Sequence, residues 1–252
     1  MDKPSSFCKN CGNSVSNVYC SHCGQSVHTS RINLHYMLHE LQHSVLHVDK
    51  GIFYTIKQMI VRPGYAIKEY LEGKRVNHFK PFSFILVLGA IYTFIVHLLN
   101  IYPEAHFFGE EANSASENNK ILFEWIYAHY SLVMFLLIPV SALSTYLTFR
   151  KSGYNYMEHV IIYSYITGMH IILLLFIYPF YYLTMSSVVY SIALIAGYIY
   201  NIWVLSQLFR KTSWAAVVAR ALFSIILSTT FMFILTVTTV LIIMYFKIYV
   251  PQ

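Results

Sequence analysis

Four long tracts of this 252-residue sequence contain no Asp, Glu, Lys or Arg: Pro81–Pro103, Trp125–Phe149, His159–Phe209 and Ala221–Phe246. About 20 residues of helix cross the hydrocarbon core of a bilayer, so the first, second and fourth tracts each fit one crossing. The third tract has 51 residues, roughly 76 Å as a single helix, and must therefore fold back on itself. We expect that hairpin around Tyr181–Ser187, just after Pro179. The sequence thus predicts five membrane helices, at residues 82–102, 124–149, 157–180, 187–209 and 217–246.

The composition agrees with an all-α membrane protein. Hydrophobic residues make up 57% of the chain and charged residues 11%, whereas soluble domains contain roughly 25% charged residues. The formal charge of +6 could suggest a nucleic-acid partner. Its distribution along the chain favours membrane orientation and contact with anionic lipid headgroups instead, so nucleic acid is not an expected partner.

The basic residues predict the orientation of the five helices. Ten of the seventeen Lys and Arg residues precede Pro81, and the loop after the first crossing is acidic. Further basic residues follow the second crossing or flank the link between the fourth and fifth: Arg150, Lys151, Arg210, Lys211 and Arg220. This alternation predicts a cytoplasmic N-terminus and a C-terminus outside. The first ten residues have no apolar core, so they do not resemble a signal peptide.

All four cysteines lie in the segment CKNCGNSVSNVYCSHCG, as two C-x-x-C pairs formed by Cys8, Cys11, Cys20 and Cys23. Each pair can form a tight turn that directs two thiolates at one metal, and the following Gly12 or Gly24 permits the backbone conformation of that turn. Four thiolates fill a tetrahedral site and leave no position for water, which predicts a structural zinc ribbon over residues 1–28. Two disulfides or an iron–sulfur cluster are the alternatives, and a reducing cytoplasm disfavours the disulfides.

Residues 29–80 are expected to form cytoplasmic amphipathic helices next to the membrane. Their apolar residues recur at helical spacing and are accompanied by basic residues: Lys57, Arg62, Lys68, Lys74, Arg75 and Lys80. Such helices lie in the membrane interface against anionic headgroups, or pack on the cytoplasmic ends of the bundle. The sequence alone leaves both arrangements open.

The string HELQH within this region matches the H-E-x-x-H pattern of zinc metalloproteases. In that interpretation His39 and His43 bind a second zinc and Glu40 is the general base, with Glu69, Glu72 or His78 as a third ligand. A helix with histidine at every fourth position also produces this string, as a solvated polar face or as an ordinary metal site.

Several ionisable residues fall within or beside the predicted membrane helices: His97, Glu124, His129, Glu158, His159 and His170. Such residues can form a path for protons, metals or solutes, or bind haem. A neutral histidine bonded to a neighbouring hydroxyl or carbonyl is the simpler expectation. His159, Tyr163 and His170 should share one face of their helix, since eleven residues make about three turns.

The segments CKNCG…YCSHCGQ, HVDKGIFYTIKQMIVRPG, EYLEGKRVNHFKPFSF and MEHV together resemble an uncharacterised bacterial family, domain of unknown function 3667. The resemblance implies a bacterial multi-pass inner-membrane protein with an N-terminal zinc ribbon, and it supplies no catalytic residues. A weaker similarity, based on five helices and a cytosolic N-terminus, is to the Yip family of membrane proteins.

Three functions are compatible with these features. The first is a non-enzymatic adaptor, in which residues 81–252 anchor the protein and the zinc ribbon binds a cytoplasmic protein. The second is a transporter of a small solute or lipid that uses His97, His129 or His170. The third is a membrane-tethered metalloprotease that uses HELQH. The sequence does not fix the oligomeric state.

Overall fold

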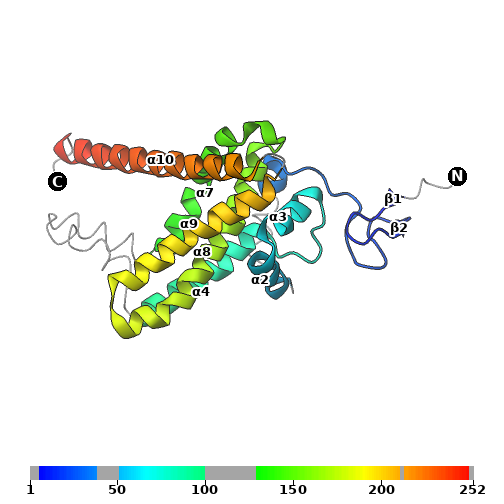
Figure 1. Cartoon of the computed structure of the whole chain (residues 1–252), viewed down its shortest axis with the longest axis horizontal. Helices are drawn as coiled ribbons and strands as arrows, with labels where there is room; N and C mark the ends of the chain where they lie inside the picture. Colours follow the sequence, from blue (N-terminus) through cyan, green and yellow to red (C-terminus); the bar gives the residue numbers. More distant parts are fainter. Residues whose placement is uncertain (1–5, 39–50, 100–128, 211–212, 250–252) are drawn as a thin grey trace.

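The computed structural model describes residues 6–38, 51–99, 129–210 and 213–249 of the chain. Two short antiparallel strands, β1 (Ser6–Phe7) and β2 (Ser14–Val15), form a small N-terminal module. Among the described residues from 51 onward, the elements are α2 (Ile52–Val61), α3 (Pro63–Glu72), α4 (Pro81–Leu99), α7 (Tyr130–Thr148), η1 (Arg150–Ser152), α8 (Tyr156–Thr184), α9 (Ser187–Leu208) and α10 (Trp214–Tyr249). The strands lie at one end of an elongated molecule, and the long helices form the rest of it (Figure 1).

Five of these helices, α4, α7, α8, α9 and α10, are long and apolar enough to cross a membrane, which confirms the expected number. The turn expected within the 51-residue tract falls between α8 and α9, where Met185 adopts a left-handed conformation with φ of 48°. Helix α8 continues past Pro179 to Thr184, beyond the expected end at residue 180. The proline removes one backbone hydrogen bond without ending the helix.

Helix α8 lies at the centre of the bundle and packs against α4, α7 and α9. In its most apolar stretch 67% of the residues are buried, compared with 11% in α10. A capping box fixes where α8 begins: Asn155 Oδ1 accepts a hydrogen bond from the amide of Glu158, and the Glu158 carboxylate accepts one from the amide of Asn155.

Helix α10 is peripheral, and its buried side chains among the described residues lie in its first half. Its buried residues, Val217, Ala221, Ser224 and Ser228, form one stripe at helical spacing, which faces α7 and α9. Beyond Ser228 the described side chains are half-buried or exposed. Accordingly, α10 diverges from the other helices toward its C-terminus (Figure 1).

The two short helices α2 and α3 meet at Arg62, whose guanidinium forms a double hydrogen bond with the Glu69 carboxylate at 3.0 and 3.1 Å. Helix α3 packs on the end of α9, and the Gly64 amide donates to Gln207 Oε1 at 3.0 Å. A Cβ atom at Gly64 would lie only 2.4 Å from the Cβ of Gln207, so the close approach requires glycine. The bundle therefore holds α3 in place.

Candidate metal centre

The N-terminal cysteine module (residues 6–28) consists of two turns with matching hydrogen bonds. In the first, the amide of Gly12 donates to the Cys8 carbonyl; in the second, the amide of Gly24 donates to the Cys20 carbonyl. Gly12 and Gly24 have φ angles of 79° and 75°, the left-handed region in which glycine is favoured. The repeated C-x-x-C-G pattern thus produces two equivalent turns that face each other.

The turns bring the four cysteine sulfurs together. All four Sγ atoms lie within 4.8 Å of one another, with Cys8 and Cys23 3.6 Å apart and Cys11 and Cys20 3.5 Å apart. These separations are too long for disulfide bonds, in which the sulfurs are about 2.05 Å apart. Tetrahedral zinc with Zn–S bonds of about 2.3 Å would place the sulfurs about 3.8 Å apart. The cluster therefore fits a metal ion bound by four thiolates.

The backbone also favours thiolates in this cluster. A hydrogen bond from the Cys11 amide is the largest effect on Cys8 and lowers its pKa to about 7. A hydrogen bond from the Cys23 amide likewise lowers the pKa of Cys20. At Cys11 the amide of Asn13 acts in the same direction, but burial and the neighbouring thiols outweigh it and raise the pKa to about 12. Four thiols this close cannot all ionise without a cation, which a metal would supply.

The module is attached to the helix bundle through the turn that contains Cys20 and Cys23. Gln25, which is 5% exposed, follows that turn, and its Oε1 accepts hydrogen bonds from the amides of Arg75 and Val76 at 3.0 and 2.9 Å. In return, Arg75 donates from its guanidinium to the Ser30 carbonyl at 3.0 Å. The segment between α3 and α4 thus holds the module by backbone and side-chain contacts.

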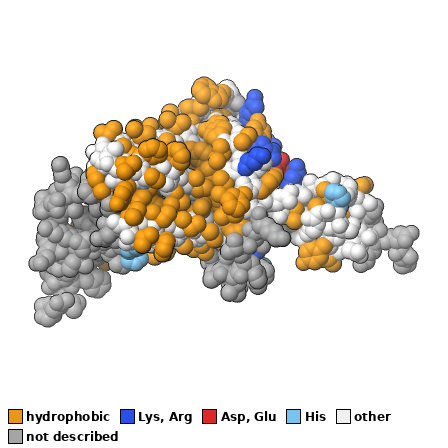
Figure 2. Space-filling view, turned by 90° about the horizontal axis from the view of Figure 1, so that it is seen from below, with side chains coloured by type: hydrophobic (Ala, Val, Ile, Leu, Met, Phe, Trp, Pro, Cys, Tyr) orange, Lys and Arg blue, Asp and Glu red, His pale blue; other side chains and the backbone are white. Residues whose placement is uncertain are grey.

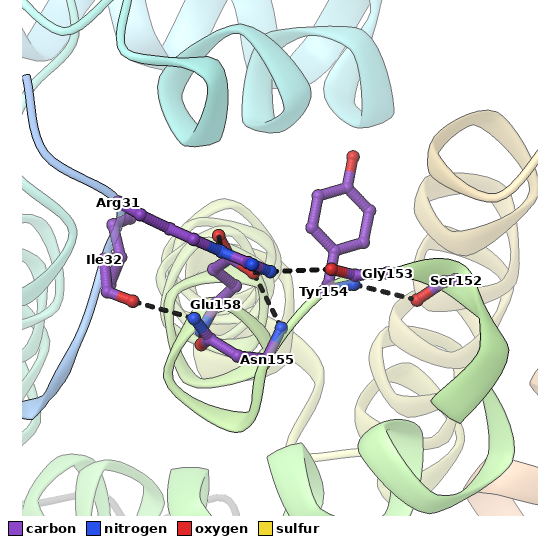
Figure 3. A network of polar contacts seen from close by, with 7 residues as sticks. All are labelled: Arg31, Ile32, Ser152, Gly153, Tyr154, Asn155 and Glu158. Carbon is purple, nitrogen blue, oxygen red and sulfur yellow. Dashed lines mark hydrogen bonds and ion pairs between the residues drawn. The ribbon is translucent and has the colours of Figure 1, made fainter.

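A second attachment joins the segment after the module to the start of α8 (Figure 3). The Arg31 guanidinium donates to both carboxylate oxygens of Glu158, at 2.9 and 2.8 Å, and to the Gly153 carbonyl at 2.6 Å. Asn155, the N-cap of α8, donates from its side chain to the Ile32 carbonyl at 2.9 Å. The capping box of α8 therefore also binds the segment that leads from the module.

The sequence-predicted second metal site lies outside the described residues, because His39, Glu40 and His43 fall between residues 38 and 51. The proposed third ligands have other partners: Glu69 pairs with Arg62 and Lys74, and Glu72 pairs with Lys68. His78 packs edge-on against the rings of Tyr54 and Tyr70. Within the described part of the chain, the four cysteines are the one group of potential ligands close enough to share a metal.

The histidines of the long helices take separate positions. His97 is exposed on α4 and His129 is half-buried just before α7, while Glu124 lies outside the described residues. His159 Nδ1 lies 3.1 Å from the Thr145 hydroxyl of α7, and His170 Nε2 lies 3.0 Å from the Gly197 carbonyl of α9. These two histidines thus have the hydroxyl and carbonyl partners that the simpler expectation described, while their neutral state stays a prediction. They contact different neighbouring helices.

Sequence reasoning did not single out Gln25, Arg31 or Asn155 as functional residues. All three are polar residues whose partners lie between 50 and 127 positions away in the sequence. The one available signal was the Asn155-x-x-Glu158 spacing, which is typical of a capping box.

One family model matches residues 49–93 of the chain; its description is "Protein of unknown function (DUF3667)". The match supports the resemblance to that family in the stretch from just before α2 to the middle of α4. No curated protein and no solved structure matches the chain.

The structure gives physical reasons for the residue pattern in the matched stretch. A Cβ atom at Gly51 would lie 2.7 Å from the Asn77 carbonyl oxygen, and Gly73 ends α3 with φ of 105°. Phe79 donates its amide to the Thr55 hydroxyl at 2.7 Å and accepts from the Tyr165 hydroxyl at 2.8 Å. The pattern therefore describes a packing unit that joins α2 and α3 to the bundle and receives the cysteine module.

Proposed function

We propose that this protein is a multi-pass protein of the bacterial cytoplasmic membrane, and that it acts as a non-enzymatic adaptor through a cytoplasmic zinc ribbon. The five apolar helices are compatible with such a membrane domain. An apolar surface extends over the bundle, and Lys and Arg side chains gather at the end next to the cysteine module (Figure 2). Cytoplasmic loops are enriched in Lys and Arg, which supports a cytoplasmic module.

Zinc is the metal that this proposal assigns to the module. Cys8, Cys11, Cys20 and Cys23 would hold it, and it would supply folding energy to a segment too short to build a hydrophobic core. With four thiolates as ligands, the ion would have no open position for a substrate. The proposed role of the metal is therefore structural.

Helix α2 would lie in the membrane interface beside the bundle. Its outward side exposes Phe53, Ile60 and Val61, with Phe53 82% exposed, and the same helix bears Lys57. A combination of large apolar and basic residues suits the boundary between anionic headgroups and acyl chains. In this proposal α2 takes the first arrangement expected for residues 29–80, in the interface, while α3 packs on the bundle.

The observation that favours an adaptor is the fixed position of the module. Gln25 of the module and Arg31, in the segment that follows the module, attach it to the bundle. On the module itself, Phe7, Val18 and Tyr19 are more than half exposed. Aromatic side chains such as those of Phe7 and Tyr19 are enriched in protein–protein interfaces. Because the module is fixed, a protein bound to these side chains would be held at a defined place on the membrane.

Photo-crosslinking in intact cells tests this function. A photoreactive amino acid at position 17, beside Val18 and Tyr19, should crosslink a cytoplasmic protein. The double variant Phe7→Ser/Tyr19→Ser should lose that product, and the matched control Ser16→Ala, which alters an exposed polar residue, should retain it. Equal crosslinking in the double variant and the control would exclude these apolar side chains as the binding surface.

A second candidate function, passage of a small solute or lipid, is favoured by one observation. His170 lines a cavity of about 360 Å³ between α7, α8, α9 and α10. The metalloprotease hypothesis depends on His39, Glu40 and His43, which lie outside the described residues, and it stays a prediction.

A further inference from the structure

The cavity between α7, α8, α9 and α10 has the size of a ligand site. Its volume of about 360 Å³ falls within the range of about 300–1,000 Å³ that is typical of small-molecule pockets. Most of its lining is apolar, with leucine, isoleucine and methionine side chains from all four helices. It lies within the part of the bundle that would be surrounded by lipid.

A buried polar pair lines one part of this cavity. Asn201 of α9 donates from Nδ2 to the Tyr163 hydroxyl of α8 at 3.2 Å, and the two residues are 5% and 6% exposed. Asn201 Oδ1 is buried and accepts no hydrogen bond from the described residues. A buried acceptor without a partner costs about 1–3 kcal/mol, so a donor supplied by a ligand would be favoured here.

His170, one turn away from Thr167 on α8, adds a second polar group. Since a carbonyl oxygen can only accept, the contact with Gly197 places the proton of the neutral imidazole on Nε2 and leaves Nδ1 as an acceptor. The Tyr163 hydroxyl accepts from Asn201, and its own hydrogen remains available for donation. The polar residues of the lining therefore carry both hydrogen-bond acceptors and a donor.

The described lining of the cavity has no fixed charge to pair with a charged ligand. Among the described residues that line it, none is Lys, Arg, Asp or Glu. A phosphate or carboxylate placed there would lose its hydration without a compensating charge, which is strongly unfavourable. A neutral group that can both donate and accept, such as a hydroxyl, fits the polar atoms present.

The position of α10 bears on how such a ligand would enter from the bilayer. The stripe that attaches α10 to the bundle ends at Ser228, which donates to the Ser141 hydroxyl at 3.1 Å, and the cavity lining continues on α10 to Met232. Past this contact α10 diverges from the other helices (Figure 1). One wall of the cavity therefore lies on α10, at residues next to the part of that helix whose described side chains are half-buried or exposed.

We infer that this cavity binds a neutral lipid with a free hydroxyl group, of the diacylglycerol class. The hydroxyl donates to Asn201 Oδ1 and accepts from Tyr163, while the acyl chains lie along the apolar lining and pass out beside α10. This inference concerns the same cavity as the second candidate function, and it holds whether or not the lipid crosses the membrane.

Binding of radiolabelled dioleoylglycerol to the purified full-length protein in detergent micelles tests the inference. Asn201→Leu removes the acceptor at similar volume and should weaken binding about tenfold, the loss expected for one or two buried hydrogen bonds. Ala193→Phe fills the cavity and should abolish binding. The matched control Ile199→Phe adds the same ring on the exposed side of α9 and should bind as the wild type does.

A competition measurement needs no variant and so does not depend on how the variants fold. Unlabelled dioleoylglycerol should displace the label from the wild-type protein, whereas its acetyl ester, which lacks the hydroxyl hydrogen, should be at least about tenfold weaker. Equal competition by the ester or by anionic phosphatidylglycerol would overturn the inference, as would unchanged binding in Ala193→Phe. Lipid binding without lipid movement between leaflets of proteoliposomes would support the inference and exclude the transport function.

Discussion

The guanidinium of Arg31 and the carboxylate of Glu158 form a double hydrogen bond, at 2.9 and 2.8 Å, between residues 127 positions apart in the sequence. The Glu158 side chain is 5% exposed and that of Arg31 is 61% exposed. Glu158 also accepts a hydrogen bond from the amide that begins α8. The same carboxylate therefore caps the central helix and binds the segment that follows the cysteine module.

Removing the Arg31 side chain should loosen the module from the bundle. In Arg31→Ala the buried Glu158 carboxylate keeps only its capping bond, and loss of the charged hydrogen bonds should destabilise the attachment by about 1–3 kcal/mol. Hydrogen exchange in detergent should become faster at the amides of residues 25–36. Lys68→Ala breaks the Lys68–Glu72 pair, which is more exposed as a whole. It should change the free energy of opening at the same amides by less than about 0.5 kcal/mol. Similar exchange in both variants would show that Arg31 does not hold the module.

Zinc content should distinguish the two metal sites that the sequence suggested. We expect one zinc per chain in the purified wild type, loss of that zinc in Cys20→Ser, and retention in the His39→Ala/His43→Ala variant. Atomic absorption on detergent-purified protein measures this directly. A second zinc that disappears only in the histidine variant would revive the protease hypothesis, and Glu40→Gln would be assayed next.

Gly64→Ala should displace α3 from the bundle. The added methyl would lie 2.4 Å from the Cβ of Gln207 and 2.7 Å from the amide of Leu208, and neither can move freely within a packed helix. Overpacking of this kind lowers the free energy of unfolding by about 1–3 kcal/mol. The midpoint of thermal unfolding, measured in detergent, should therefore fall. Lys68→Ala, a change on an exposed position of α3, serves as the control. A wild-type midpoint in Gly64→Ala would contradict the close approach of α3 and α9.

His78 should make the protein less stable in mild acid. Burial lowers its pKa from 6.5 to about 4, an effect that the charge of Glu69 partly opposes and that of Arg62 reinforces. The unfolded chain therefore binds a proton between pH 6.5 and about pH 4 that the folded chain does not, so this group reduces stability as pH falls through that window, by about 3 kcal/mol in total. In His78→Gln the fall in thermal midpoint between pH 7 and pH 4.5 should be smaller. An identical pH dependence of the thermal midpoint in the wild type and in His78→Gln would show that His78 does not cause the loss of stability in acid.

Features that depend on local composition were predictable from the sequence. The tracts without charge gave the number of apolar helices, because about 20 such residues suffice to cross a bilayer irrespective of what surrounds them. The cysteine spacing gave the sulfur cluster, because a C-x-x-C-G turn is fixed by a few adjacent residues. The length of the 51-residue tract predicted that it folds back on itself, and the turn was expected just after Pro179. Helix α8 extends to Thr184, a few residues beyond its expected end.

The tertiary structure alone decided which distant residues meet. Arg31 could have bound any acidic residue, and helix packing made Glu158 its partner. Asn201 could have been fully hydrogen-bonded, but packing left its Oδ1 buried without a partner among the described residues, in a side chain that lines the cavity. Hydrophobic periodicity assigns a residue to a helix face, but it contains no information on which other helix will cover that face. The sequence determined five membrane-type helices and a four-thiol cluster, whereas the attachment between them and the cavity beside α10 arise from contacts that form only when the helices pack.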